Sequence, residues 1–165
     1  MIRIAGTVEC VEAIVESDPW IDLKISWYPR FAGQPLYVRL SGNNGGEVEL
    51  KLEPATGRLM QAIVIDVPPL GEMDREIGAT VGAGRVPLVD LAELGVRENA
   101  QIAIPARSVV RLSASLTYSR AENLAVLGIS ESAAAEYIDC GDAWVGVSAE
   151  GELVAIAGGI RSTVS

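Results

Sequence analysis

The sequence contains no histidine. Ser-His-Asp and Cys-His catalysis within the chain is therefore impossible, and so are zinc sites that use histidine ligands. The two cysteines, Cys10 and Cys140, are too few for a disulfide framework or a four-ligand metal site. These absences predict no cofactor and no metal. No recognisable set of catalytic residues remains. The sequence therefore favours a protein that is not an enzyme, without deciding whether any catalysis occurs.

Positive charge and long apolar runs are also scarce. The 165 residues include 13 basic and 22 acidic side chains, for a net charge of −9. Nucleic acids and anionic membrane surfaces require dense positive charge, so both are excluded as partners, whereas a cationic partner is permitted. The longest apolar runs, such as residues 153–160, are far shorter than the roughly 20 residues of a membrane span. An acidic stretch near the N-terminus further predicts a soluble, cytoplasmic protein.

What the sequence does have is strict alternation of apolar and polar residues, which predicts half-buried strands. Residues 21–28 and 112–119 show this alternation most clearly. Further strands follow each of them in a similar order, and both series contain a turn that ends in a late glycine, Gly57 and Gly151. Residues 21–66 and 112–158 are therefore predicted to be two copies of one four-strand meander.

The remaining segments complete the prediction. Residues 7–16 favour a strand over a helix because they are rich in β-branched side chains, and 85–90, 100–104 and 2–4 also favour strands. Residues 71–84 are predicted to be a flexible connection. Short helices are expected at 131–138, after an N-cap at Ser130, and at 90–95, where Asp90 and Glu93 have capping-box spacing.

The predicted fold is mainly β, a sandwich or distorted barrel with one or two short helices and an internal pseudo-twofold duplication. Residues 1–66 would form the first β-unit, 67–99 a connecting segment and 100–165 the second unit, around one shared core. A unit of about 45 residues buries its own apolar face poorly, so the two copies are expected to cover each other.

The second copy resembles a family of small bacterial β-hairpin domains of unknown function. The resemblance rests on Leu116-Thr-Tyr118, Leu124-Ala-Val126, Val145-Gly-Val-Ser148, Glu150-Gly-Glu-Leu-Val154 and Ile156. The first copy matches through Leu50, Leu52, Gly57, Arg58, Leu59 and Ile63. Ser148 and Ala155 depart from the family's acidic and glycine positions, and Pro54 is added in the first copy. The resemblance implies the fold and no activity.

The aromatic side chains are the candidate binding residues: Trp27, Tyr37, Tyr118, Tyr137 and Trp144. They predict either a concave pocket between the copies or core residues whose polar tips reach water. Alternation places Trp144 on the outer face of its strand, which favours a covering layer or an interface, with Gly146 beside it allowing close approach.

Three other clusters favour simple structural interpretations. The acids Glu9, Glu12, Glu16, Asp18 and Asp22 lack calcium-loop spacing and are expected to form a solvated surface. Cys140 lies in a predicted turn at 139–142 and is assigned a structural role. The glycine-rich segment 78–85 lacks a Walker lysine and is expected to be a connection rather than a phosphate site.

The leading functional hypothesis is a non-enzymatic binding protein, in one concrete form an acidic, immunity-type antagonist of a basic secreted effector. The alternative is a small-molecule-binding β-barrel, such as a cyclase or isomerase that acts on a hydrophobic substrate. A homodimer through Trp144 is a third expectation.

Overall fold

The structure is a computed structural model that describes residues 1–71, 80–95 and 109–161, without the side chains of 80–82. Every regular element in these ranges is a β-strand, and no helix occurs in them. The strands form two six-stranded sheets and a two-stranded ribbon, none of which closes on itself. No helix in the described ranges has the length and apolar character to cross a membrane. The mainly-β prediction is confirmed.

The first sheet has the strand order β2-β3-β6-β5-β4-β9. These strands are β2 (Glu12–Glu16), β3 (Lys24–Tyr28), β6 (Leu59–Asp66), β5 (Glu47–Leu52), β4 (Leu36–Gly42) and β9 (Val109–Ala114). Neighbours pair antiparallel except β4 and β9, which run parallel. Along β5, buried and half-buried residues alternate strictly, so one face of the sheet enters the core and the other meets solvent.

The second sheet has the strand order β10-β11-β14-β13-β12-β7. These strands are β10 (Thr117–Arg120), β11 (Leu124–Gly128), β14 (Leu153–Gly159), β13 (Ala143–Val147), β12 (Glu136–Cys140) and β7 (Thr80–Ala83). The ribbon pairs β1 (Ile4–Glu9) with β8 (Arg85–Val89). The strands expected within 7–16 and at 85–90 are therefore confirmed.

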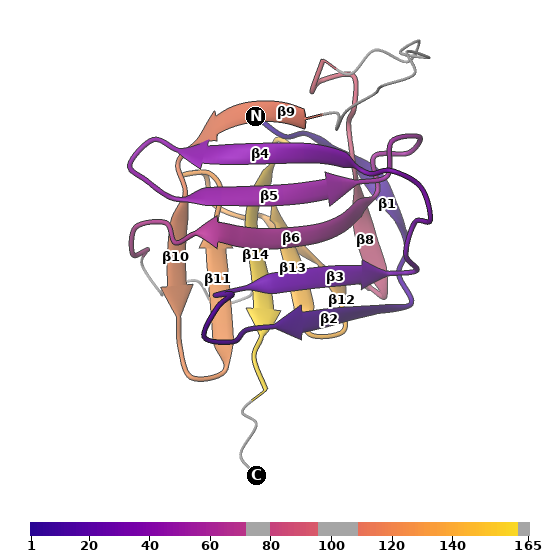
Figure 1. Ribbon diagram of the computed structural model, residues 1–165. Helices are drawn as coiled ribbons and strands as arrows, with labels where there is room; N and C mark the ends of the chain where they lie inside the picture. Colours follow the sequence, from indigo (N-terminus) through magenta and orange to yellow (C-terminus); the bar gives the residue numbers. More distant parts are fainter. Residues whose placement is uncertain (72–79, 96–108, 162–165) are drawn as a thin grey trace.

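The two large sheets pack face to face around one apolar core, and the strands of the first sheet lie across those of the second (Figure 1). Crossed sheets of this kind form an orthogonal sandwich. The ribbon stands at one side, where its Val86 and Val89 are buried in the same core. Both large sheets supply the largest fully buried side chains, which include Trp27, Leu50, Leu127 and Ile156.

The two turns with late glycines form as the sequence predicts. Gly57 has φ +79° and Gly151 has φ +83°, a region that side chains on an L-residue rarely adopt. At Gly57 a side chain would also collide with β8, because an added Cβ would lie 2.1 Å from the Val89 carbonyl oxygen. The Val89 amide donates to the Gly57 carbonyl at 2.8 Å, so this glycine ties the β5–β6 turn to the ribbon.

Cys10 and Cys140 form a disulfide, which the sequence analysis did not anticipate. Cys10 follows β1 and precedes β2, and Cys140 ends β12. The bond therefore ties the segment that enters the first sheet to a hairpin of the second. A single bridge of this kind is not a framework, but it closes a loop over a sequence separation of 130.

The predicted helices are wrong. At 90–95 the Asp90 carboxylate accepts hydrogen bonds from the amides of Ala92 and Glu93, as a helix cap would, but only a turn follows. Ser130 likewise accepts from the amide of Ser132, and the chain then enters β12. Both side chains accept hydrogen bonds from local amides. A stable helix also needs several further residues, because ordering its first turn costs more free energy than the first hydrogen bond returns.

The predicted duplication is not supported, and a closed barrel is excluded because the sheets are open. Residues 112–119, which the sequence aligned with 21–28, divide between β9 and β10, and these strands belong to different sheets. The strand orders β3-β6-β5-β4 and β11-β14-β13-β12 are alike and match β5 with β13 and β6 with β14, as the sequence does, but they match β3 with β11 and not with residues 112–119. β7 lies in the segment predicted to be a flexible connection, and the strand expected at 100–104 lies outside the described residues.

Candidate functional site

The strongest candidate site lies along β2, the edge strand of the first sheet. β2 pairs with β3 on one side, and a hollow of about 580 Å³ follows its other side. We call this hollow the β2 groove. It is lined by Glu12, Ala13, Ile14, Val15, Glu16, Ser17, Asp18, Asp142, Gly159, Ile160 and Arg161. Figure 1 shows β2 at the free edge, with β14 ending beside it.

The groove is acidic, with four carboxylates and one cation in its lining. The cation, Arg161, pairs with Asp142 at 3.1 Å and so removes one of these charges. Glu16 lies 3.8 Å from Lys24, a long ion pair whose Glu16 side chain is 54% exposed. Because Arg161 offsets only one of the four carboxylates, the lining of the groove keeps an excess of negative charge.

The loop between β2 and β3 carries the most exposed large apolar side chain of the described residues, Trp20, which is 92% exposed. The loop is held by its own hydrogen bonds. The Asp18 carboxylate accepts from the amides of Trp20 (2.7 Å) and Ile21 (2.8 Å), and the Ser17 hydroxyl donates to the Asp22 carbonyl (2.8 Å). A tryptophan normally buries most of its ring, so this fixed loop leaves an unusually large apolar side chain in contact with water.

Two residues of β10, in the second sheet, brace this loop. The guanidinium of Arg120 donates to the Ser17 hydroxyl at 2.7 Å. The phenol of Tyr118 donates to the Asp22 carbonyl at 3.1 Å. Trp20 is thus presented from a loop that both sheets position, at the end of the groove that Ser17 and Asp18 line.

Of the five predicted binding residues, Trp27 and Tyr37 line a common hollow, which is on the outer face of the first sheet. Trp27 is buried and belongs to the core, whereas Tyr37 is half-buried. The Lys51 ammonium lies 5.7 Å from the centre of the Tyr37 ring. Neither this hollow nor the β2 groove brings the five together.

The other three predicted residues lie in or on the second sheet. Tyr118 and Tyr137 are buried, and the Tyr137 ring lies where a side chain at Gly146 would be, 3.1 Å from an added Cβ. Trp144 is half-buried. Ala157 of β14 pairs with Trp144 of β13. It is buried, but it does not belong to the main hydrophobic core. This agrees with a covering layer, part of which is the segment before β12, because Ala134 also lies 3.1 Å from that Cβ position.

Sequence reasoning missed Trp20, although a signal was present. Asp18-Pro-Trp20 is a turn sequence, and an aromatic residue placed directly in a turn has no strand face to bury it. The acidic stretch that the sequence predicts to be a solvated surface supplies three of the four carboxylates of the groove, those of Glu12, Glu16 and Asp18. In the described ranges no group of three ligating side chains is placed to hold a metal ion.

A third hollow, of about 300 Å³, opens between the β4–β9 edge of the first sheet and the segment that follows β11 in the second. Its lining combines apolar side chains (Ile2, Leu40, Leu112, Ile129 and Leu153) with hydroxyl groups (Ser113, Ser115, Ser130 and Ser132). Its lining has no Lys or Arg side chain, and Glu131 is its one acidic side chain.

No protein-family model and no curated protein matches the chain.

Proposed function

We propose that the protein is a non-enzymatic binding module that holds a positively charged protein partner at the β2 groove, with Trp20 as the anchor. The observation that carries the proposal is the 92% exposure of Trp20 on a loop fixed by hydrogen bonds, at the end of an acidic groove. Tryptophan is enriched among the few interface residues that dominate binding energy. Complementary charge around such an anchor raises the association rate and selects the partner.

The partner class follows from the charge. A chain of net charge −9 repels acidic proteins and attracts basic ones, and the groove concentrates this charge beside Trp20. An immunity-type antagonist of a basic secreted effector is the specific form that we favour. The disulfide supports a site of action in an oxidising compartment rather than the cytoplasm expected from the sequence, because cytosolic thiols are kept reduced. The homodimer through Trp144 stays a prediction.

Affinity capture from an extract of the native source, at low and high salt, tests this function. Immobilised wild-type protein is expected to retain one stoichiometric basic protein at low salt and to release it as the ionic strength rises. Trp20→Ala should weaken the purified complex at least tenfold, roughly 1.4 kcal/mol, as expected for an interface anchor. Glu12→Gln with Glu16→Gln should mainly slow association.

The matched control is Leu70→Ala, which removes another exposed apolar side chain (87% exposed) that does not line the groove. It should leave the complex unchanged. Retention of no stoichiometric basic protein contradicts the proposal. Equal weakening by Trp20→Ala and Leu70→Ala contradicts the assignment to the β2 groove.

The alternative function, a small-molecule-binding barrel, is excluded in its barrel form because the sheets are open. Binding of a small apolar molecule keeps one specific observation in its favour, the serine-rimmed hollow with its apolar lining. Its volume of about 300 Å³ lies at the lower end of the range for ligand pockets.

A further inference from the structure

The hollow on the outer face of the first sheet is lined by basic side chains, although the molecule as a whole is acidic. We call it the cation pocket. It has a volume of about 370 Å³ and is lined by Lys24, Ser26, Trp27, Arg30, Phe31, Gly33, Pro35, Tyr37, Lys51, Met60 and Gln61. Three of these residues are cations and none is an acid, in a chain whose acids outnumber its bases by 22 to 13.

The sheet brings these cations together from distant positions in the sequence. Lys24 comes from β3, Lys51 comes from β5, and Arg30 comes from the loop that joins β3 to β4. β6 lies between β3 and β5 and contributes Gln61 to the floor. No local run of basic residues marks the site, which is why composition and charge patterning do not reveal it.

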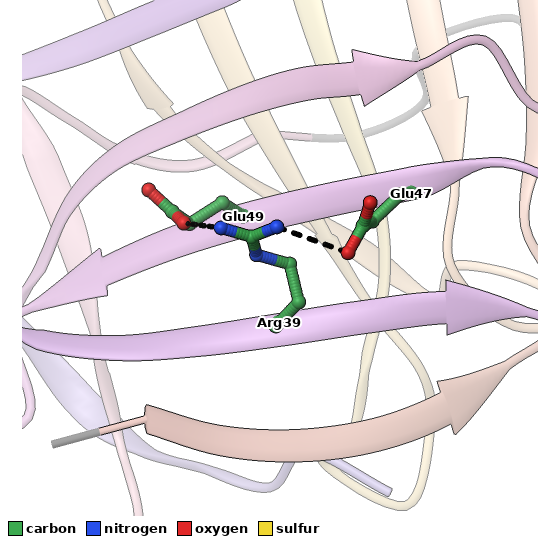
Figure 2. A network of polar contacts seen from close by, with 3 residues as sticks. All are labelled: Arg39, Glu47 and Glu49. Carbon is green, nitrogen blue, oxygen red and sulfur yellow. Dashed lines mark hydrogen bonds and ion pairs between the residues drawn. The ribbon is translucent and has the colours of Figure 1, made fainter. Parts of the chain in front are cut away.

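The carboxylates nearest to Lys51 on the same strand are engaged elsewhere. Glu49 and Glu47 both bind the Arg39 guanidinium, which forms one ion pair with each of them (Figure 2). These hydrogen bonds, first that of Glu47 and then that of Glu49, raise the pKa of Arg39 above its ordinary value. Because Arg39 holds both acids, Lys51 has no carboxylate within ion-pair distance among the described residues.

The other two cations are only weakly compensated. Arg30 lies over the Tyr28 ring, 5.3 Å from its centre, and donates to the Tyr28 hydroxyl at 3.0 Å, with no ion pair among the described residues. Lys24 has the 3.8 Å contact with Glu16. Contacts with aromatic rings leave a cation its full charge, so the pocket offers an anion three positive groups.

The uncharged side chains of the lining indicate what a bound anion would contain besides its charged group. Phe31 and Tyr37 supply aromatic rings, and Pro35 and Met60 add apolar surface. The Gln61 amide donates to the Ser26 hydroxyl at 3.1 Å, which fixes the orientation of an uncharged polar group in the lining. We propose that the cation pocket binds a free small organic anion, a planar ring that bears a phosphate or carboxylate group. This site is independent of the proposed protein partner at the β2 groove.

Phenyl phosphate is the probe, because it combines a planar ring with a phosphate group. Titration of the oxidised 165-residue chain by calorimetry and by amide chemical shifts should show saturable binding, with the largest shifts on β3, on β5 and in the 29–35 loop. Inorganic phosphate, which has the charge alone, and benzyl alcohol, which has the ring alone, should each bind at least about tenfold more weakly. Added salt should weaken the binding of phenyl phosphate.

Lys51→Gln and Arg30→Gln should each lower the affinity for phenyl phosphate about fivefold to tenfold, since each removes one charge-assisted contact. The matched control is Arg111→Gln, which removes an exposed cation from β9 on the same sheet, outside the pocket lining. It should bind as the wild type does. Urea unfolding of each variant checks that the fold is intact. Absence of saturable binding overturns the proposal, as does equal weakening by Arg111→Gln, whereas failure of the protein-capture experiment leaves it standing.

Discussion

Tyr118 joins the two large sheets through a single side chain. Its ring is buried, at 7% exposure, and its phenol donates to the Asp22 carbonyl just before β3. Burial raises the pKa of Tyr118 above its ordinary value, because the phenolate would lose its hydration. The nearby Arg120 acts in the opposite direction and is outweighed.

This shift predicts a loss of stability at alkaline pH. The folded protein holds the Tyr118 proton to a higher pH than the unfolded chain, so the free energy of unfolding falls as the pH rises above about 10. Tyr118→Phe should cost about 1 kcal/mol at neutral pH, through loss of the hydrogen bond to Asp22, and should flatten the alkaline decline. Urea unfolding of both proteins at pH 7 and at about pH 10.5 measures both effects. An alkaline decline of the same steepness in the variant contradicts the assignment.

At the scale of single residues, sequence reasoning found the aromatic side chains but not their surroundings. Trp27 follows the alternation of its strand into the core, as the apolar pattern indicates. Trp20 has no such pattern, because it stands in a turn. The cation pocket depends on neighbours across strands, and pairing distances such as that of Tyr37 and Lys51 exist only once the register of β4 and β5 is set.

Among the elements, β14 packs unusually close to β2 and β3. Gly158 makes this approach possible, because an added Cβ would lie 2.8 Å from Val15 Cγ1 and 3.2 Å from Ile25 Cδ1. Val15 is on β2 and Ile25 is on β3, so one glycine in the second sheet receives side chains from two strands of the first. Close packing of this kind tolerates little added volume.

Gly158→Ala should therefore destabilise the protein by about 1–3 kcal/mol through overpacking. Val15→Ala removes the nearest atoms, so the double variant should lose at least about 0.5 kcal/mol less than the sum of the two single variants. Gly159→Ala is the matched control, because its Cβ would meet nothing closer than 3.4 Å. Urea unfolding of the four variants gives the coupling. Strict additivity, or an equal effect of Gly159→Ala, contradicts the proposed contact.

Most strands could be predicted from the sequence, and their partners could not. The apolar pattern locates β3, β4, β5, β6, β11, β13 and β14 because each has at least one face in the core, and β11 and β14 are buried at nearly every residue. It fails at β12, where an alanine-rich lead and the Ser130 cap indicate a helix, although Tyr137 and Ile138 are buried in a strand. It also fails at the parallel pairing of β4 with β9, because no local pattern encodes a neighbour about 70 positions away.

At the scale of the whole molecule, the net charge of −9 conceals two surfaces of opposite charge, and both of them belong to the first sheet. The β2 groove lies along the edge of that sheet, and the cation pocket lies on its outer face. The Glu16–Lys24 pair joins them, since Glu16 lines the groove and Lys24 lines the pocket. A basic protein and a small anion could therefore bind side by side, each attracted by the charge that repels the other.

The disulfide between Cys10 and Cys140 constrains the whole chain, because the two cysteines are 130 positions apart in sequence. Closing so long a loop restricts the unfolded ensemble, and the native contacts on both sides of the bond remain when it is broken. Cys10→Ser with Cys140→Ser should therefore keep the fold and lower the free energy of unfolding by about 2–5 kcal/mol. Wild-type protein treated with a thiol reductant should match this double variant.

Urea unfolding of the oxidised, reduced and doubly substituted proteins measures the difference, and a thiol titration of the native protein counts its free cysteines. The double variant should show no further change with reductant, which separates loss of the bond from other effects of the reagent. Two free thiols in protein purified under oxidising conditions would contradict the bond itself. Equal unfolding midpoints with and without reductant would show that the sheets hold together without it. A protein that needs this bond would lose several kcal/mol in a reducing cytoplasm, so the measured loss also bears directly on the proposed compartment.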